Sequence, residues 1–434
     1  MRNIYNSTGH ELKYSNFIRA ENCTLIDSEG KKYLDLESGV WCTSIGHSHP
    51  RITETISEQS SKMMHSGYCY LNPIIDIAAD KIIDITGIGS GKCVFLCSGS
   101  ESVEYAVKLS RSISDKRRLL TMKNCYLSAY GISGERSEDD WVHFDWANDS
   151  VIEKIDFSQI AAFVFEPGSS LGLVRFPPAN LIQQIVSNIR RNGGIVIANE
   201  VTTGTGRTGK WFGYQHYGFI PDIVAIGKGL GNGYPVSCVA ISEEIVNRIN
   251  PDRFHYAQSH QNDPLGAAIA KQVIEILETE DLLDRANEIG SMISRKLEEI
   301  RSKYGIIKEV RHRGLMIAIE FEENEECSFA QMINSKLLEK HIILVKRPGY
   351  EVFRIDPALT IELKDVEYFL KSLETAIAEV RTKTSGSARR SKSAPSTEAN
   401  SASTQSSIKL QRLSITAGTA CEWRETLVAM PVCP

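Results

Sequence analysis

The sequence predicts an α/β protein with a large domain around a mainly parallel sheet and a smaller α/β domain. Between about residues 71 and 250, short apolar runs alternate with amphipathic helical patterns, which is typical of a parallel sheet covered by helices. A second, smaller set of strand and helix patterns follows from residue 305 to about 380. The length of 434 residues is enough for two or three such units.

The elements can be predicted in chain order. A β-hairpin is expected to turn at Ser28, Glu29 and Gly30, because polar turn residues there separate two strand-like runs. The remaining predictions are buried strands at residues 94–96, 161–165, 194–198, 223–226 and 238–241, helices at 101–113 and 181–191, a long helical stretch at 263–303, strands at 315–320 and 352–355, and a closing helix at 363–380.

These elements suggest a division of the chain. We assign residues 1–70 to an N-terminal segment of the small domain and 71–260 to the large domain. Residues 261–304 form a helical connection, and 305–381 complete the small domain. Residues 382–434 are expected to be a disordered or appended tail, because a stretch rich in Ser, Ala and Thr cannot bury enough apolar surface to offset its chain entropy.

Composition excludes several classes of function. The formal net charge of −5 leaves no basic footprint for nucleic acid. No apolar run approaches membrane-spanning length, and the first residues lack a signal-peptide core. The ten cysteines are scattered without the spacing of a zinc site, so we expect no metal, reduced thiols and a cytoplasmic location.

Lys228 is the most informative single residue. It lies in Ile226-Gly-Lys-Gly-Leu-Gly-Asn-Gly-Tyr-Pro, directly after an apolar strand-like run. A partly desolvated amine in a glycine-rich turn can lose its proton and form a Schiff base with a flat ligand. The simpler alternative is a surface lysine that follows a buried strand.

Two further motifs could complete a site around this lysine. Cys97-Ser-Gly-Ser-Glu-Ser ends a strand and begins a helix, where Gly99 and Ser100 could hold a phosphate; the alternative is an ordinary capping box. Asn199 and Glu200 end a buried strand before a glycine-rich turn. Because neighbouring strand residues face opposite sides, only one of the two can face a ligand.

Tyr126 lies a few residues after a further predicted strand, Leu119-Leu-Thr-Met. An aromatic side chain at a strand end can stack on a flat ring, although most aromatic residues simply belong to the core.

Taken together, the motifs resemble the class III aminotransferases of the ornithine, acetylornithine and ω-amino-acid type, a fold type I group that depends on pyridoxal 5'-phosphate. The resemblance covers roughly residues 15–380. Its markers, in the order of the family, begin at Ser38-Gly-Val-Trp, Ser98-Gly-Ser-Glu, Phe165-Glu-Pro, Asn199-Glu-Val-Thr, Gly227-Lys-Gly-Leu, Asn262-Asp-Pro-Leu, Arg313-Gly-Leu-Met and Phe353-Arg-Ile-Asp-Pro.

The resemblance implies a role for each matching position. Lys228 would form the Schiff base with the cofactor, and the Gly99–Ser100 turn would hold its phosphate. Ser259 falls where the family reaches the phosphate of the partner subunit, which implies a homodimer with shared active sites. The other implied contacts are stacking by Tyr126 and binding of a substrate carboxylate by Arg354. Apart from the resemblance, Trp41, Tyr68 and Tyr70 are candidates for lining the substrate pocket.

The departures from the family pattern are equally informative. Asn199 stands where the family has an Asp that keeps the cofactor ring protonated, so the ring would be a weaker electron sink. Thr202 replaces a Gln that contacts the ring hydroxyl. The glutamate that gates the carboxylate-binding arginine is missing, since Ser170 or Leu171 falls there. We therefore expect Arg354 to stay free, which favours α-carboxylate substrates.

Three functions are compatible with these residues. The first is an aminotransferase that moves an amino group between an amino acid or amine and a keto acid or aldehyde. The second is a racemase or epimerase, which Asn199 favours and which needs a second acid/base opposite Lys228, with Tyr68, Tyr70 and His255 as candidates by type. The third is a cofactor-binding protein without catalysis.

Overall fold

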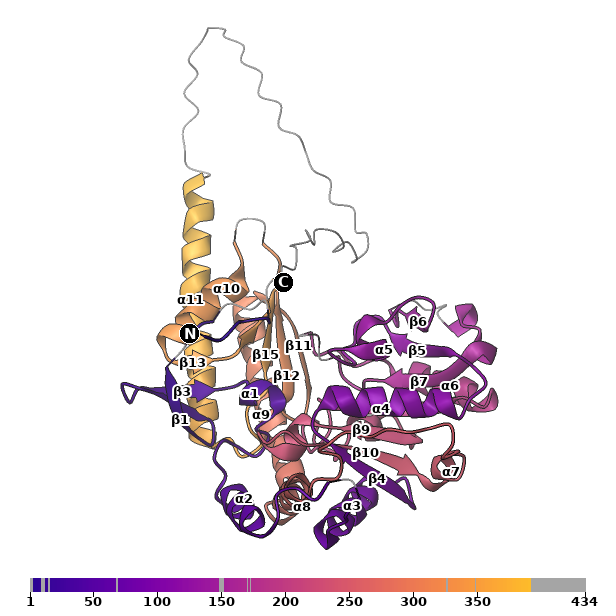
Figure 1. Ribbon diagram of the computed structural model, residues 1–434. Helices are drawn as coiled ribbons and strands as arrows, with labels where there is room; N and C mark the ends of the chain where they lie inside the picture. Colours follow the sequence, from indigo (N-terminus) through magenta and orange to yellow (C-terminus); the bar gives the residue numbers. More distant parts are fainter. Residues whose placement is uncertain are drawn as a thin grey trace, which may run out of the picture. The chain divides into compact units, whose positions relative to one another are not determined.

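The computed structural model describes residues 3–8, 12–14, 16–67, 69–147, 152–169, 171, 173–324, 327–347 and 349–391, with side chains as far as residue 382. Residues 1–386 form one compact unit. It contains one seven-stranded sheet and two four-stranded sheets (Figure 1). No helix in these ranges is both long enough and apolar enough to cross a bilayer.

The seven-stranded sheet confirms the prediction of a mainly parallel sheet. Its strand order is β4-β10-β9-β8-β7-β5-β6, and within it β10 alone runs antiparallel to its neighbours. The strands are β4 (Gly91–Leu96), β5 (Arg118–Met122), β6 (Trp141–Phe144), β7 (Ile160–Phe165), β8 (Ile195–Glu200), β9 (Ile223–Ile226) and β10 (Ser237–Ser242).

Nearly every residue of the central strands is buried, because helices cover both faces of this sheet. On β8, Ile195 and Ile197 pack into the cluster that contains α4, whereas Val196 and Ala198 face the clusters that contain α3, α6 and α8. This alternation follows from the two-residue period of a strand. The helices are α3 (Pro73–Thr86), α4 (Gly99–Ser112), α6 (Ala179–Arg191) and α8 (Pro264–Thr279), with the shorter α5 (Gly131–Glu135) and α7 (Glu243–Val246) nearby.

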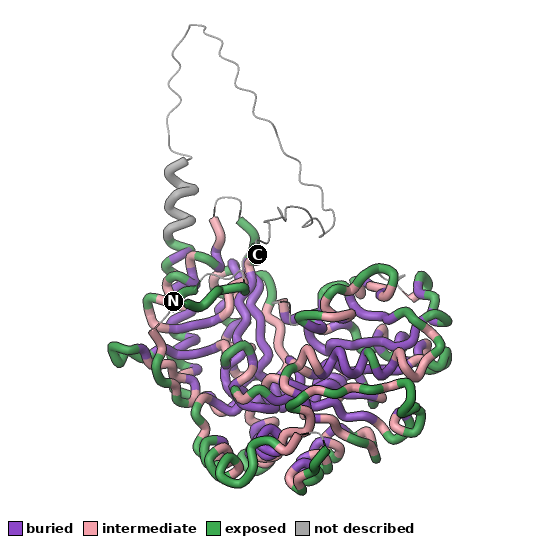
Figure 2. The backbone as a smooth tube through the Cα atoms, viewed as in Figure 1, coloured by how far each residue is buried: buried purple, intermediate pink, exposed green. Residues whose placement is uncertain are grey.

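The two smaller sheets surround the largest apolar cluster, which also contains α9 and α11. Figure 2 shows buried backbone running through these strands as it does through the central sheet. One sheet contains β1 (Phe17–Glu21), β2 (Thr24–Asp27), β3 (Lys32–Asp35) and β13 (Ile342–Ile343); the other contains β11 (Ile307–Arg313), β12 (Met316–Phe321), β15 (Val352–Ile355) and β14 (Val345–Lys346). The remaining helices are α1 (Ser38–Trp41), α2 (Pro50–Lys62), α9 (Leu282–Tyr304), α10 (Phe329–Glu339) and α11 (Leu363–Ser391).

Two helical predictions differ from the structure. The stretch 263–303 is two helices, α8 and α9, because Asp281 adopts a left-handed backbone with φ of 49° and redirects the chain. Asp is one of the few residues that tolerate this conformation. The closing helix α11 runs to Ser391, past the boundary at 381; the rest of the predicted tail lies outside the described residues.

Candidate active site

The motifs predicted to form a site meet at one edge of the central sheet. They follow the ends of β4, β5, β8 and β9, and the carboxyl ends of strands in open α/β sheets form the usual ligand crevice. A cavity of 390 Å³ lies there. The predicted residues that line it are Gly99, Ser100, Tyr126, Asn199, Thr202 and Lys228.

Lys228 is partly buried, and among the described residues its amine makes one hydrogen bond, to a neutral side chain. Its Nζ donates to Oγ1 of Thr202 at 3.0 Å. Burial lowers the pKa of Lys228, and the nearby Glu166 carboxylate only partly opposes this shift. The backbone of Lys228 has φ of 44°, a strained conformation for a residue with a side chain. Burial therefore favours the neutral, nucleophilic form of this amine more than solvent exposure would.

The turn before α4 is both a capping box and an anion-binding cradle. Oγ of Ser98 accepts from the Glu101 N–H, and the Glu101 carboxylate accepts from the N–H groups of Cys97 and Ser98. The N–H groups of Gly99 and Ser100, on the cavity wall, have no hydrogen-bond partner among the described residues. A Cβ at Gly99 would collide with the side chain of Val201, so only glycine fits there.

Asn199 faces the cavity with its amide fixed at both ends. Its Nδ2 donates to the backbone oxygen of Tyr126 at 3.0 Å, and its Oδ1 accepts from the Val201 N–H at 3.2 Å. The second N–H of this amide has no hydrogen-bond partner among the described residues, so it can donate to a ligand atom that carries no proton.

Glu200 faces the opposite side of the sheet, as the strand period predicts. Its carboxylate accepts from Oγ1 of Thr203 and from the N–H groups of Gly213 and Tyr214, at 2.7–2.8 Å. It is fully buried, and this burial raises its pKa to about 7. Glu200 thus stabilises the segment that follows β8 and does not contact a ligand in the cavity.

Arg354 and Trp41 do not line the cavity, but they form a buried cluster next to Lys228. The Trp41 ring lies 3.5 Å from Cζ of Arg354 and 5.3 Å from Nζ of Lys228, measured to its centroid. Nε of Arg354 donates to Oδ2 of Asp356 at 2.6 Å. The expectation of a free arginine is therefore wrong: Arg354 is only 6% exposed and is paired. Its Nη1 and Nη2 make no hydrogen bond within the described part of the chain.

Trp41 reaches this position through an unusual backbone. Ser38, Gly39, Val40 and Trp41 have successive φ values of 47°, 54°, 60° and 66°, so α1 is a left-handed turn. Such a turn costs roughly 1–2 kcal/mol for each residue other than glycine. Strain of this kind concentrates at functional sites, and here it places an aromatic ring close to two cationic side chains.

Other predicted residues lie away from the cavity. Ser259 and His255 are exposed and do not line it, and Tyr70 is 75% exposed. Tyr68 and Ser170 lie outside the described residues.

Residue-level reasoning missed three side chains of the site. Glu166 accepts from the Tyr126 N–H at 3.1 Å and acts on Lys228, and Cys42 lines the cavity. Asp356 orients Arg354. Glu166 and Asp356 lie inside two of the family markers, Phe165-Glu-Pro and Phe353-Arg-Ile-Asp-Pro. An acidic residue within such a marker was the feature of the sequence that could have identified each of them.

The cavity fits pyridoxal 5'-phosphate by its chemistry. The N–H groups at the N-terminus of α4 can donate to a phosphate, and the Lys228 amine can react with an aldehyde. The Asn199 amide can donate to a ring nitrogen, and the Tyr126 ring offers a flat face for stacking.

Comparison with known proteins gives a consistent picture. The family model described as "Aminotransferase class-III" matches residues 5–129 and 138–377. A leucine/methionine racemase of Thermococcus litoralis is 29% identical, covering 84% of this chain and 90% of the relative. The 5-aminovalerate aminotransferase DavT of Pseudomonas aeruginosa is 30% identical, covering 83% and 93%. The crystal structure of acetylornithine aminotransferase from Elizabethkingia anophelis superimposes with a TM-score of 0.77 at 28% identity, covering 86% of this chain and 96% of that one.

Proposed function

The chain belongs to the class III aminotransferases, and from that premise we propose how its own residues perform the reaction. Members of this family are pyridoxal-phosphate-dependent enzymes, so this chain is an aminotransferase rather than a cofactor-binding protein without catalysis. When bound, the cofactor supplies an aldehyde that takes up the amino group and a ring that withdraws electrons from the substrate's Cα.

We propose that Lys228 binds the cofactor aldehyde and moves the substrate proton. The observation that carries this role is its buried amine on the cavity wall, with its pKa lowered by burial. Lowering the pKa of an amine increases the share of its neutral form, which can act both as nucleophile and as general base. Thr202 orients the amine by accepting its hydrogen bond.

Borohydride reduction followed by peptide mapping tests this role. In the cofactor-loaded enzyme we expect the label on Lys228 alone, and Lys228→Ala should abolish both the label and turnover. Lys210→Ala is the matched control, because Lys210 is an exposed lysine bonded to the Gln215 carbonyl outside the cavity. A label on another lysine in the wild-type enzyme would overturn the proposal.

We further propose that Arg354 binds a substrate carboxylate. Asp356 holds Nε, and Trp41 covers the guanidinium face, so only the Nη1–Nη2 edge remains for a bidentate contact. A charged hydrogen-bonded pair contributes about 1.5–3 kcal/mol. Arg354→Ala should therefore raise KM for carboxylate substrates roughly 10- to 100-fold and leave an amine without a carboxylate unaffected. Equal effects on both substrates would contradict this role.

The proposed assembly is a homodimer with shared active sites in the cytoplasm. Ser259 supports the dimer, because it is exposed on the described chain and the resemblance places it at the partner's phosphate. The eight described cysteines are all free, which supports a reducing compartment.

Light scattering tests the dimer. Ser259→Ala should weaken cofactor binding, whereas Ser57→Ala, at another exposed serine, should not.

Racemisation is the second candidate function. Asn199 favours it, because a weaker electron sink discourages protonation at the cofactor carbon, and a racemase is among the similar proteins. Solvent deuterium separates the two reactions. Transamination produces a keto acid and the aminated cofactor, whereas racemisation exchanges and inverts Cα without a keto product. We expect the keto product, since Tyr70 and His255, two of the candidate second acids, lie away from the cavity.

A further inference from the structure

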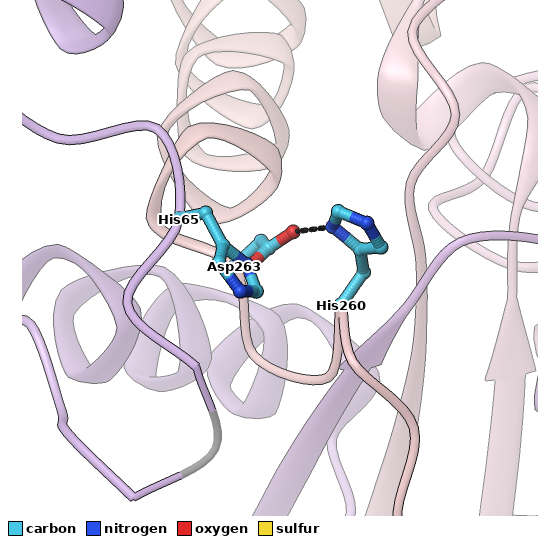
Figure 3. Close-up of side chains that lie close together, drawn as sticks. All are labelled: His65, His260 and Asp263. Carbon is cyan, nitrogen blue, oxygen red and sulfur yellow. Dashed lines mark hydrogen bonds and ion pairs between the residues drawn. The ribbon is translucent and has the colours of Figure 1, made fainter.

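Three side chains that commonly bind metals come together in the structure, although no spacing in the sequence pairs them. His65 lies between α2 and α3, while His260 and Asp263 lie in the loop before α8 (Figure 3). Nδ1 of His65 is 2.5 Å from Oδ1 of Asp263, and Nδ1 of His260 is 2.6 Å from Oδ2. All the donor atoms lie within 4.8 Å of one another.

The carboxylate of Asp263 is aimed at the two imidazoles rather than at its own helix. Asp263 is the N-cap residue of α8, yet its side chain accepts no capping hydrogen bond. Asp at this position normally satisfies an orphan N–H of the first helical turn. Both of its oxygens are instead engaged by histidines, one of them 198 residues away in the sequence.

On the single described chain, the two imidazole rings are exposed and can adjust to an ion. The side chains of His65 and His260 are 45% and 60% exposed, while that of Asp263 is 14% exposed. Zinc binds nitrogen and carboxylate oxygen at about 2.0–2.2 Å, so tetrahedral ligand atoms lie roughly 3.3 Å apart. Small rotations of the two exposed rings would open the present contacts to that separation.

We propose that His65, His260 and Asp263 form a binding site for a divalent first-row transition metal, of which Zn²⁺ is the natural probe. Two imidazoles and one carboxylate are a ligand set suited to zinc with a fourth position left for water. Mg²⁺ and Ca²⁺ prefer oxygen ligands throughout and should not bind here.

The position of this site gives a bound metal a consequence for the enzyme. Asp263 lies close enough to act electrostatically on Cys97 and Tyr234, which both line the cofactor cavity. A metal would also fasten the segment that leads to Tyr70 to the loop that carries Ser259. We therefore expect it to stiffen the rim of the cavity and to stabilise the folded chain by mass action.

Calorimetric titration of the cofactor-loaded full chain with Zn²⁺ tests the proposal. We expect one site per chain, no binding of Mg²⁺, and a rise in Tm with Zn²⁺. His65→Ala and His260→Ala should each weaken the affinity at least about tenfold, since even the loss of an outer-shell partner costs 10- to 100-fold. His255→Ala is the matched control, because His255 is exposed on the same loop but lies outside the cluster.

The double variant His65→Ala/His260→Ala measures zinc bound elsewhere, since it retains all ten cysteines and the cofactor phosphate. If it binds Zn²⁺ with the stoichiometry and affinity of the wild type, or if Mg²⁺ raises Tm as Zn²⁺ does, the proposal is overturned. Neither result would affect the role of Lys228, which the borohydride experiment tests independently.

Discussion

The amide of Asn199 shows how one side chain can tune the chemistry of the whole site. Its oxygen already accepts from the Val201 N–H and its nitrogen donates to the Tyr126 carbonyl. A carboxylate at this position would hold a proton on the cofactor ring nitrogen, whereas the remaining amide N–H can only donate to an unprotonated nitrogen. The surrounding backbone is therefore arranged for an amide.

Asn199→Asp should raise the turnover of transamination and lower the stability of the cofactor-free chain. Turnover rises because a protonated ring is the stronger electron sink. Stability falls by about 1–3 kcal/mol, because a carboxylate oxygen would face the Tyr126 carbonyl. Single-turnover kinetics and thermal unfolding measure the two effects. Unchanged turnover would show that the electron sink does not limit the reaction.

Asp356 acts as a positioning residue for Arg354. It is fully buried; this burial raises its pKa, and the charges of Arg354 and Arg207 oppose the shift. Asp356→Asn removes the charge that fixes Nε of Arg354. We expect KM for carboxylate substrates to rise about tenfold with little change in kcat, from the loss of one charged hydrogen bond. A matching rise for an amine without a carboxylate would indicate a purely structural role.

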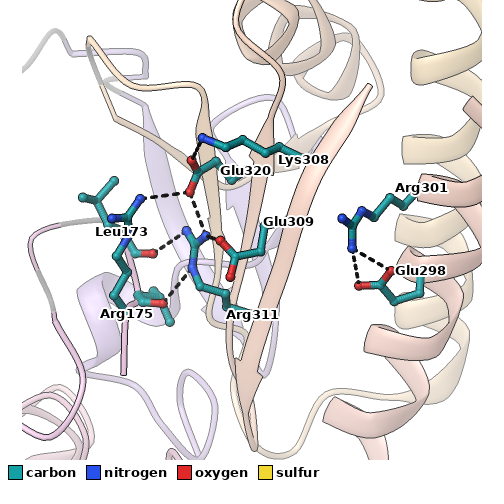
Figure 4. A network of polar contacts seen from close by, with 9 residues as sticks. Leu173, Arg175, Glu298, Arg301, Lys308, Glu309, Arg311 and Glu320 are labelled. Carbon is teal, nitrogen blue, oxygen red and sulfur yellow. Dashed lines mark hydrogen bonds and ion pairs between the residues drawn. The ribbon is translucent and has the colours of Figure 1, made fainter. Parts of the chain in front are cut away.

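At the scale of elements, a polar network joins the β11–β12 hairpin to the loop that follows β7 (Figure 4). Glu320 on β12 is bonded to Lys308 at 2.8 Å, Arg311 at 2.7 Å and Arg175 at 3.3 Å. Arg311 also donates to the Leu173 carbonyl at 2.8 Å. One carboxylate therefore gathers three cations from two separate parts of the chain.

This network predicts a specific pH dependence of stability. Burial raises the pKa of Glu320, but bonds from Lys308 and Arg311 outweigh it and bring the pKa to about 2. The lowered pKa means that its contribution is fully present above the unfolded value, about 4.3, and is lost as pH falls towards 2. Glu320→Gln should cost about 1–3 kcal/mol at pH 7, progressively less as pH falls below about 4.3, and nothing only well below pH 2.

Urea unfolding at several pH values measures this difference. Glu309→Gln is the control, because the side chain of Glu309 is 51% exposed and forms an ion pair with Arg311, and exposed pairs contribute about 0–1 kcal/mol. A cost for Glu320→Gln that stays constant between pH 7 and pH 3 would contradict the assignment.

At the scale of the whole molecule, α11 closes the largest apolar cluster. Ala376, Ile377 and Val380 are fully buried within it. A chain that stops after Ser391 should keep its cofactor absorbance and Tm, because residues 392–434 have the composition of a tail. A chain that stops after Leu373 should lose several kcal/mol, since each large buried side chain contributes about 2–5 kcal/mol. Loss of cofactor binding in the longer variant would show that the tail is structural.

The sequence by itself determined most strands of the central sheet, most helices and the chemistry of the cavity wall. Strand and helix periodicities are local properties of the chain, and Lys228, Gly99, Ser100, Tyr126, Asn199 and Thr202 follow strand ends, which a parallel sheet brings to one edge. The tertiary structure alone decided the pairing of Arg354 with Asp356, the left-handed turn that places Trp41, and the meeting of His65 with His260 and Asp263. Such contacts depend on loop paths and side-chain directions between distant segments, which no local pattern encodes.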